Sequence, residues 1–331
     1  MTRALITGVG GQDGSYLAEL LLGAGYEVTG LVRPGAPRYE NLAAVEGRIE
    51  LHEADLLNQT SLAQALRVAR PTEVYNLAAP SFVPDSWEQP VQTAEFAAVG
   101  ATSLLEAIRL VDPTIRFYQA SSSEIFGDPD EVPQTEATAL APVTPYGVAK
   151  AYAHLSARSY RHRYGIFACS GILYNHESPR RPLKFLPRKV AHGAAAISLG
   201  LEQELLLGDL EATRDWGYAG DYVRAMHLML KQDQPGDYVV ASGESHSVGE
   251  LVQCAFARVG LDWQQHVRVD PGLQRGAAQL HRLVGSPSKA RSQLGWEPEF
   301  DFTKLVHLLV DADLERLRAR ADETVTSMER L

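Results

Sequence analysis

Short apolar runs and stretches with helical periodicity alternate along the first half of this chain. The apolar runs include ALIT (4–7), EVTGLV (27–32) and EVYNLAA (73–79), and the helical stretches include SYLAELLLGAGY (15–26) and TSLAQALRVA (60–69). Strands that alternate with amphipathic helices form βαβ units with parallel strands and right-handed crossovers. The pattern therefore predicts an α/β fold with a Rossmann-like, doubly wound parallel sheet, whose ligands bind at the carboxyl ends of the strands.

Beyond residue 175 the alternation loosens, because three prolines fall within the segment HESPRRPLKFLPRK. Proline cannot continue a regular helix or a central strand. We predict a cofactor-binding Rossmann domain over residues 1–175, with later returns near 214–242. A smaller C-terminal substrate-binding lobe is expected over 176–320 and interleaves with the first domain. We expect residues 321–331 to form a frayed tail.

The composition narrows the class of protein. The chain of 331 residues has a formal net charge of -10 at pH 7, so a nucleic-acid partner is not expected. The N-terminus enters a predicted strand directly, and no apolar segment is typical of a signal peptide or a membrane span. Cys169 and Cys254 are the two cysteines and lie far apart in the chain. They indicate free thiols in a reducing cytoplasm and offer no cysteine pair for a metal.

A glycine-rich loop follows the first predicted strand. In TGVGGQDGSYL, three glycines have the spacing G-x-x-G-x-x-G between a strand and a helix. Such glycines allow a tight turn, the close approach of a pyrophosphate and close packing of the helix on the strand. The N-terminus of the helix offers backbone N–H donors to the phosphates. The sequence therefore predicts a dinucleotide bound at this loop by Gly8, Gly11, Gln12, Asp13 and Gly14.

The end of the second predicted strand bears on the choice between NAD and NADP. An NAD-selective site usually carries an acidic residue there, which binds the 2′-hydroxyl of the ribose. This chain instead has Arg33, with Arg38 as a second candidate, and an arginine can neutralise a 2′-phosphate. We therefore predict NADP as the cofactor, with NAD as the alternative. Further cofactor contacts are expected at the ends of the third and fourth strands, from Asp55, Leu56, Leu77 and Ala78.

Tyr146 and Lys150 stand four residues apart in TPYGVAKAYAHL, on one face of a predicted helix. A free phenol has a pKa of about 10 and is a poor base at neutral pH. A neighbouring ammonium favours the phenolate and can also bind the hydroxyls of a nicotinamide ribose. Such a tyrosine can take the proton of a substrate hydroxyl while the same carbon is oxidised. We predict that both residues are catalytic and contact the cofactor.

Taken in order, the glycine loop and the segments NLAAPSFV, YQASSSEIFG, PYGVAK, GILYNHESPRR and RDWGYAGDYV resemble the extended short-chain dehydrogenase/reductases, and among them the GDP-mannose 4,6-dehydratase family. The resemblance runs from about residue 3 to about residue 318. It implies an NADP-dependent dehydration of a GDP-sugar that yields a 4-keto-6-deoxy sugar, in a homodimer or homotetramer. The substrate-binding residues that it implies are Ser81, Asn175, Lys189, Arg214 and Arg275.

The resemblance also implies a role for Glu124 in YQASSSEIFG. Oxidation at C4 of a hexose acidifies the proton at C5, and loss of that proton expels the 6-hydroxyl group. One carboxylate can take the C5 proton and then protonate the departing hydroxyl. Glu124 is implied in this role, and Ser122, which stands where the family has threonine, is implied as a relay for the O4 proton. Epimerases and ketoreductases of this fold do not need the carboxylate for elimination, so it favours a dehydratase.

Three segments depart from the family pattern. Pro80 replaces a glutamine, RPGAPR (33–38) shortens a stretch that helps to bind NADP and join subunits, and LQRGAAQLHRLVG (273–285) lacks a glutamate. In the family these segments contact the sugar, the base and the cofactor. The sequence therefore does not determine the exact sugar and base of the substrate.

Two alternatives to a dehydratase remain at this point. One is an NADPH-dependent 4-ketoreductase or an epimerase of the same fold, which would also act on a GDP-sugar. The other is a non-enzymatic scaffold that binds the cofactor. A scaffold has no chemical reason to keep four reactive side chains in register, namely Ser122, Glu124, Tyr146 and Lys150.

Overall fold

The structure is a computed structural model that describes residues 2–35, 39–273 and 283–328. Within these residues seven strands form one parallel sheet in the order β11-β6-β5-β4-β1-β2-β3. Its strands are β1 (Arg3–Thr7), β2 (Glu27–Val32), β3 (Glu50–Glu53), β4 (Glu73–Asn76), β5 (Arg116–Ser122), β6 (Ala168–Leu173) and β11 (Asp237–Val240). The doubly wound parallel sheet predicted from the alternation of strands and helices is confirmed.

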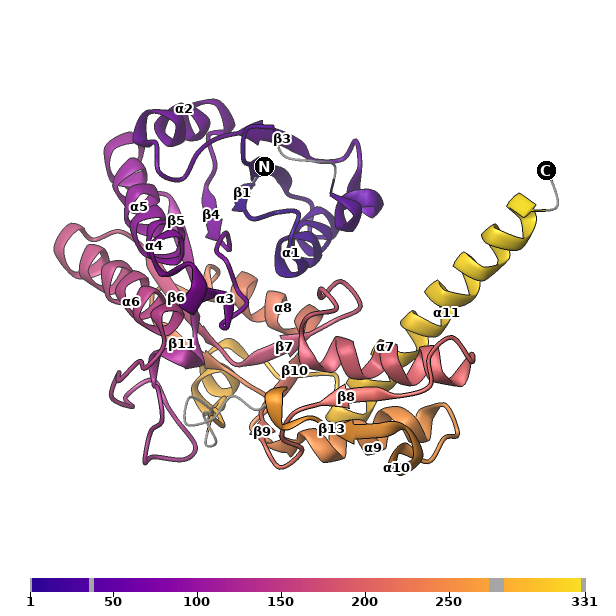
Figure 1. Ribbon diagram of the computed structural model, residues 1–331. Helices are drawn as coiled ribbons and strands as arrows, with labels where there is room; N and C mark the ends of the chain where they lie inside the picture. Colours follow the sequence, from indigo (N-terminus) through magenta and orange to yellow (C-terminus); the bar gives the residue numbers. More distant parts are fainter. Residues whose placement is uncertain (1, 36–38, 274–282, 329–331) are drawn as a thin grey trace.

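Helices cover both faces of the sheet (Figure 1). Ile6 of β1 packs among residues of one cluster and its neighbour Leu5 among residues of another, because successive side chains of a strand point to opposite faces. Both faces are therefore buried, which is why the strands read as continuous apolar runs. The helices of the first face are α1 (Gln12–Gly23) and α8 (Ala219–Met229), and those of the second are α2 (Gln59–Ala69), α5 (Gly100–Val111) and α6 (Pro145–Tyr164).

Short helices occupy several connections between these elements. The turn η1 lies between β2 and β3, three short helices lead into α5, and η3 follows β5. Their bounds are η1 (Glu40–Val45), α3 (Asp85–Glu88), α4 (Pro90–Ala94), η2 (Glu95–Val99) and η3 (Ser123–Ile125).

The direction in which the sheet grows reverses at β1. β2 and β3 follow on one side of β1, whereas β4 lies on its other side. Folds of this kind bind ligands in the crevice at the carboxyl ends of the strands where the order reverses. The loops approach each other closely there: Gly8 has φ +69°, and a Cβ on it would lie 2.9 Å from Cα of Ala78. A glycine is therefore required at position 8 both by its backbone and by the neighbouring loop.

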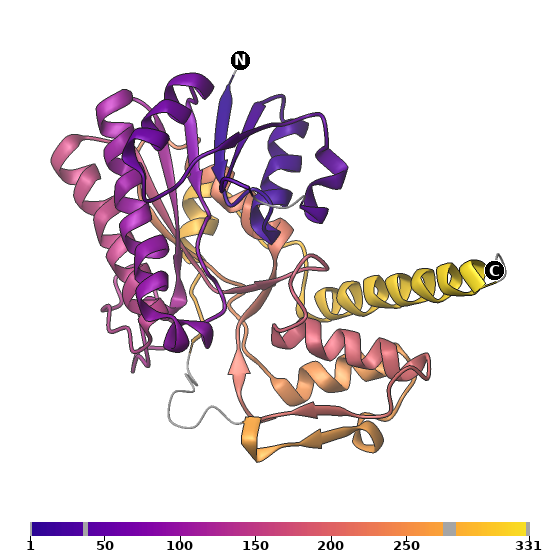
Figure 2. The same ribbon diagram turned by 45° about the horizontal axis from the view of Figure 1, so that its top comes forward.

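Several helices lie away from the large sheet (Figure 2), and their buried side chains form a separate hydrophobic cluster. It is built mainly from α7 (Leu186–Ser198), α9 (Val248–Arg258) and the first part of α11 (Phe302–Met328). Three strand pairs accompany these helices: β7 (Asn175–Glu177) with β10 (Trp216–Tyr218), β9 (Thr213–Arg214) with β12 (His246–Ser247), and β8 (Leu205–Leu207) with β13 (Val267–Val269). The remaining short helices are α10 (Trp263–His266), η4 (Pro271–Leu273) and η6 (Ala290–Leu294).

The chain passes more than once between this cluster and the sheet. It leaves the sheet after β6, returns for α8 and β11, and leaves again for α9. Further along the chain, η6 and the buried Trp296 pack beside α8, on the large sheet. The crevice at the sheet edge is therefore bordered by residues from widely separated parts of the sequence.

The last helix, α11, continues to Met328, so the described part of the expected tail is drawn as helix. Leucine, alanine, glutamate and arginine dominate residues 312–321 of this helix, and these residues have high helix propensity. The first part of α11 packs on α7, and the remainder extends away from the body of the protein (Figure 2). In the described ranges no helix combines the length and the apolar character needed to cross a bilayer.

Candidate functional site

A cleft of about 500 Å³ opens at the carboxyl ends of β1, β4 and β5. The loops that follow the first five strands line it, together with the start of α6 and the strand β7. Parallel strands end at one edge of their sheet, so side chains far apart in the sequence meet here. This cleft is the candidate functional site.

The glycine loop after β1 forms one wall of the cleft. Its fold leaves little space for a Cβ atom at two of its glycines. A Cβ on Gly14 would collide with the carbonyl oxygen of Gly8, and one on Gly11 would lie 3.2 Å from the same oxygen. Gly11 is the N-cap of α1 and provides no side-chain cap, so the N–H groups of the first helical turn are available to an anion. The loop therefore fits the pyrophosphate of a dinucleotide.

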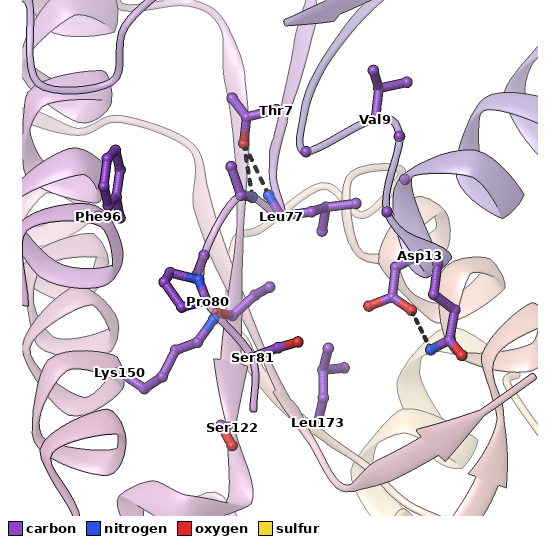
Figure 3. Close-up of a pocket in the computed structure, with 18 of the residues that line it drawn as sticks. Thr7, Val9, Asp13, Leu77, Pro80, Ser81, Phe96, Ser122, Lys150 and Leu173 are labelled. Carbon is purple, nitrogen blue, oxygen red and sulfur yellow. Dashed lines mark hydrogen bonds between the residues drawn. The ribbon is translucent and has the colours of Figure 1, made fainter. Parts of the chain in front are cut away.

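Thr7 holds the loop on the opposite wall in place (Figure 3). Its Oγ1 accepts hydrogen bonds from the N–H groups of Leu77 and Ala78, each at 3.1 Å, and donates to Oδ1 of Asn76 at 2.8 Å. Ser81 lies further along the same loop and lines the cleft. Close contacts therefore fix both loops at the reversal point of the sheet, namely the glycine loop after β1 and the loop after β4.

Tyr146 and Lys150 project from the first turns of α6 and are both buried. Nζ of Lys150 donates to the carbonyl oxygen of Ala120 at 3.0 Å and lies 5.6 Å from the centroid of the Tyr146 ring. Burial raises the pKa of Tyr146 to about 12, although a hydrogen bond with Ser122 acts in the opposite direction. Burial also lowers the pKa of Lys150 to about 8. Burial therefore opposes both the phenolate form of Tyr146 and the charged form of Lys150, the two forms that the catalytic role requires.

Ser122 and Glu124 stand beside Tyr146 at the end of β5. Oγ of Ser122 accepts from the N–H of Glu124 at 3.3 Å and also bonds with Tyr146. Serine lacks the methyl group that restricts a threonine rotamer, but these two contacts hold its hydroxyl toward Tyr146. Oε2 of Glu124 accepts from Oγ1 of Thr144, the N-cap of α6, at 3.4 Å. A Cβ on Gly147 would lie 2.5 Å from the carbonyl oxygen of Glu124, so α6 packs directly on the turn that carries this carboxylate.

Asp13 and His176 form a partly buried ion pair between the glycine loop and β7. Nε2 of His176 lies 2.9 Å from Oδ2 of Asp13, and its Nδ1 lies 2.7 Å from the carbonyl oxygen of Tyr174. Both ring nitrogens therefore face acceptors, which suits a doubly protonated imidazolium. Burial alone would lower the pKa of His176, but Asp13 raises it above the usual value. Burial would raise the pKa of Asp13, but His176 and Arg181 lower it to about 2.

The structure brings most of the predicted site residues together. Those that line the cleft are Gly8, Gly11, Gln12, Asp13, Gly14, Arg33, Leu56, Leu77, Ala78, Ser81, Ser122, Glu124, Tyr146, Lys150 and Asn175.

Three predicted residues have side-chain contacts elsewhere and are not among the described residues that line the cleft. Oδ1 of Asp55 accepts from the N–H of Leu57 at 3.0 Å, because β3 ends before it at Glu53. Nζ of Lys189 donates to the carbonyl oxygen of Leu206 at 2.7 Å, and Nη1 of Arg214 donates to that of Thr213 at 2.6 Å. Arg38 and Arg275 lie outside the described residues.

Sequence reasoning did not assign several residues that line the cleft, among them Tyr39, Phe96, His176 and Arg181. Phe96 lies in η2, a π-helical turn, and such turns are frequent at functional sites. His176 and Arg181 stand within NHESPRR, so the motif itself marked them. Tyr39 carried no recognisable signal in the sequence.

Comparisons with known proteins identify relatives of this chain. The family model described as GDP-mannose 4,6 dehydratase matches residues 5–309. The chain is similar to GDP-mannose 4,6 dehydratase 2 of Arabidopsis thaliana, with 47% identity over 94% of this chain and 87% of that protein. It is also similar to the GDP-mannose 4,6 dehydratase of Homo sapiens, with 43% identity over 95% of this chain and 92% of that protein.

Among solved structures, the fold is similar to that of DesIV, a dTDP-glucose 4,6-dehydratase from Streptomyces venezuelae whose structure contains NAD. The two chains have a TM-score of 0.85 and 26% identity, over 95% of this chain and 97% of the other.

The pair of Asp13 and His176 predicts a defined dependence of stability on pH. The raised pKa of His176 gives stability that is present below about pH 6.5 and is lost as the pH rises through its folded value. The lowered pKa of Asp13 gives stability that is present above about pH 4 and is lost as the pH falls toward about 2. We expect Asp13→Asn to lower the melting temperature by about 2–4 °C at pH 5.5, and by less at pH 8.5.

Thermal denaturation of the purified protein at both pH values measures this difference. The exposed Asp128 provides the control, since Asp128→Asn should change little at either pH. A destabilisation by Asp13→Asn that stays constant from pH 5.5 to 8.5 would contradict the assignment of an ion pair.

Proposed function

Because the chain belongs to the GDP-mannose 4,6-dehydratase family, we propose that it is a hydro-lyase that converts GDP-mannose to GDP-4-keto-6-deoxymannose and water. The observation that carries the proposal is the carboxylate of Glu124 in the same cleft as Ser122, Tyr146 and Lys150. Oxidation and reduction at C4 alone would need only a tyrosine, a lysine and a hydroxyl group. Elimination of water needs an additional acid and base, which Glu124 supplies.

The residues of the glycine loop and of the loop after β4 would hold a nicotinamide dinucleotide, and Lys150 would reach its ribose. A bound nicotinamide supplies the oxidation at C4 and the later reduction at C6. Tyr146 accepts the proton of the C4 hydroxyl through Ser122, whose Oγ is already held toward the phenol. The charged Lys150 beside the ring favours the phenolate at this step.

Glu124 then takes the proton from C5, which the new C4 ketone has made acidic. The same carboxyl group gives that proton to the 6-hydroxyl, which leaves as water, and a C5=C6 double bond forms. Reduction at C6 and return of a proton to C5 complete the cycle, and this proton balances the one lost from O4. The contact of Glu124 with Thr144 supports this role, because a hydroxyl at the start of α6 orients the carboxylate.

For the cofactor we propose NADP, supported by the position of Arg33 in the cleft at the end of β2. For the substrate we propose contacts from Ser81 and, toward its GDP part, from Asn175, both of which line the cleft. Lys189 and Arg214 stay candidates for the diphosphate, although each would have to exchange its bond to a main-chain carbonyl oxygen for the ligand.

We also propose that the protein forms a homodimer, or a homotetramer built from such dimers, in the cytoplasm. Val148, Tyr152 and Leu155 are exposed on one face of α6, at the spacing of an apolar helical stripe. Val99 and Leu110, near the two ends of the neighbouring α5, are exposed as well. A second copy that covers these side chains would remove them from water. The two free cysteines suit a reducing compartment.

The principal test is incubation of the protein with GDP-mannose and NADP, followed by mass spectrometry. We expect loss of one water from the sugar without net reduction of the cofactor. Glu124→Gln should lower the rate of dehydration by at least about 10²-fold, since a positioned acid or base contributes about 10²–10⁴-fold. The variant should still oxidise C4, which is visible as bound reduced nicotinamide, but it should exchange little C5 hydrogen with deuterated solvent.

Tyr146→Phe is the matched control, because it should abolish the first oxidation and show no reduced nicotinamide at all. Dehydration by Glu124→Gln at close to the parental rate would reject Glu124 as acid and base. Consumption of NADPH in proportion to a 4-keto sugar would indicate a ketoreductase instead.

Arg33→Ala should weaken binding of NADP more than binding of NAD, because it removes a cation that can face the 2′-phosphate. A charged hydrogen bond of this kind contributes about 1.5–3 kcal/mol, which corresponds to a loss of about 10–150-fold for NADP. Titration of each cofactor against the parent and the variant measures the ratio. Equal losses for NADP and NAD would show that Arg33 does not read the 2′-phosphate.

Leu155→Glu should separate the proposed dimer into monomers, because it places a charge in the apolar face of α6. Light scattering after size-exclusion chromatography gives the mass of each form. Leu201→Glu is the control, since Leu201 is similarly exposed but follows α7, away from this face. A parent protein that is monomeric, or a Leu155→Glu variant that remains dimeric, would exclude this interface.

A further inference from the structure

Gly10 in the glycine loop is a glycine for a reason that its backbone does not explain. Unlike Gly8, it does not adopt a positive φ. A Cβ on Gly10 would instead collide with Cδ1, Cγ and Cε1 of Tyr39, all closer than 3.0 Å. For the other glycines of the loop, Gly11 and Gly14, the nearest atoms belong to the backbone of the loop itself. The absence of a side chain at position 10 is therefore matched to one aromatic ring.

The ring is anchored by the segment that follows it. Tyr39 is the N-cap residue of η1, and Nδ2 of Asn41 donates to the carbonyl oxygen of Gly10 at 3.2 Å. Leu42 and Val45 of η1 are buried in the cluster that also contains the side chains of α1. The glycine loop is thus held from its outer side both by the ring of Tyr39 and by the amide of Asn41.

This contact separates two cavities. Gly10 and Tyr39 line the cleft described above, and both also line a neighbouring pocket of about 430 Å³. The walls of the second pocket include Arg180, Arg188 and Arg316. If the ring were absent or displaced, the outer side of the glycine loop would open toward this basic pocket and toward water.

The contact also lies at a particular end of the cleft. Arg33 and Ala54, at the carboxyl ends of β2 and β3, line the cleft together with Tyr39. In folds with this topology the adenosine half of a dinucleotide lies over these strands, and the nicotinamide half lies toward the other side of the reversal point. Tyr146 and Lys150 mark the nicotinamide side. Tyr39 is therefore placed at the adenosine side.

We propose that Tyr39 is a positioning residue for the adenosine half of the nicotinamide dinucleotide and that Gly10 and Tyr39 act as a matched pair. The ring closes the outer wall of the cleft and holds the glycine loop in the shape that presents its N–H groups to the phosphates. This inference rests on the proposed function in requiring that the protein binds such a dinucleotide.

The matched pair predicts coupled effects. Gly10→Ala should push the ring aside, and Tyr39→Ala should remove it, so both open the same wall. Each change should weaken NADPH binding by about tenfold, within the range of couplings between residues in contact. In the Tyr39→Ala background, Gly10→Ala should cause almost no further loss, because its Cβ then has space. Tyr39→Phe should bind like the parent, since the nearest atoms are ring carbons.

The experiment is a titration of NADPH, followed by its fluorescence, against the parent, the two single variants, the double variant and Tyr39→Phe. Competition by adenosine 2′,5′-bisphosphate and by nicotinamide mononucleotide then locates the effect. We expect the variants to lose affinity for the adenosine fragment and to keep that for the nicotinamide fragment. Gly23→Ala is the control for a Gly→Ala change in this region, because Gly23 ends α1 with no atom near its missing Cβ. Melting temperatures identify any variant that is merely unfolded.

The outcomes are distinct. Unchanged affinity in Gly10→Ala and Tyr39→Ala, with a parent that binds NADPH, would overturn the inference and leave the proposed function intact. The inference would also be overturned if the loss of NADPH affinity in the double variant equalled the product of the two single losses. A loss of affinity confined to the nicotinamide fragment would overturn it as well. A parent that binds neither NADPH nor NADH would overturn both the inference and the proposed function.

Discussion

The partly buried ion pair of Asp13 and His176 is the interaction on which the arrangement of the cleft depends. It joins residues that are 163 positions apart: the first turn of α1 and the strand β7, where the chain leaves the large sheet. Two buried charges are costly unless both are fully satisfied. Here Asp13 also accepts from Gln12, and His176 faces the carbonyl oxygen of Tyr174 and stacks on Tyr222. The pair therefore favours this position of β7 relative to the glycine loop.

A second carboxylate, that of the buried Asp215, helps to hold the strands β7 and β10 in place. Asp215, just before β10, accepts hydrogen bonds from the N–H groups of Ser242, Gly243 and Gly285. These donors lie beyond β11, on the side of the large sheet, while β10 pairs with β7. Burial still raises the pKa of Asp215 to about 6, because three donors and a hydroxyl only partly replace water. With both carboxylates in place, the parts of the chain that border the cleft are held at two points.

The chemistry of the cleft follows from burial as much as from the identity of its side chains. Tyr146 and Lys150 are close enough to interact, yet burial raises the pKa of the phenol and lowers that of the ammonium. Ser122 lacks a methyl group but gains a fixed orientation from the N–H of Glu124. The turn η3 packs tightly against Gly147. It thus sets the positions of the Ser122 hydroxyl and the Glu124 carboxylate together.

The sequence by itself determined the features that depend on local pattern. The alternation of apolar runs and helical stretches specified the parallel sheet, because both faces of each strand must be covered. The spacing of Gly8, Gly11 and Gly14 and of Tyr146 and Lys150 placed these residues correctly, because one strand end or one helix turn relates them.

Only the tertiary structure decided which distant segments meet and how charged each group is. Lys189 and Arg214 belong to motifs that resemble a substrate site, yet their side chains bond to nearby carbonyl oxygens. The ring of Tyr39 on Gly10 and the further rise in the pKa of Tyr146 had no signal in the sequence. A contact across 29 residues depends on the path of the intervening chain, and a pKa depends on burial by all the surrounding elements. Neither quantity is a property of a short stretch of sequence.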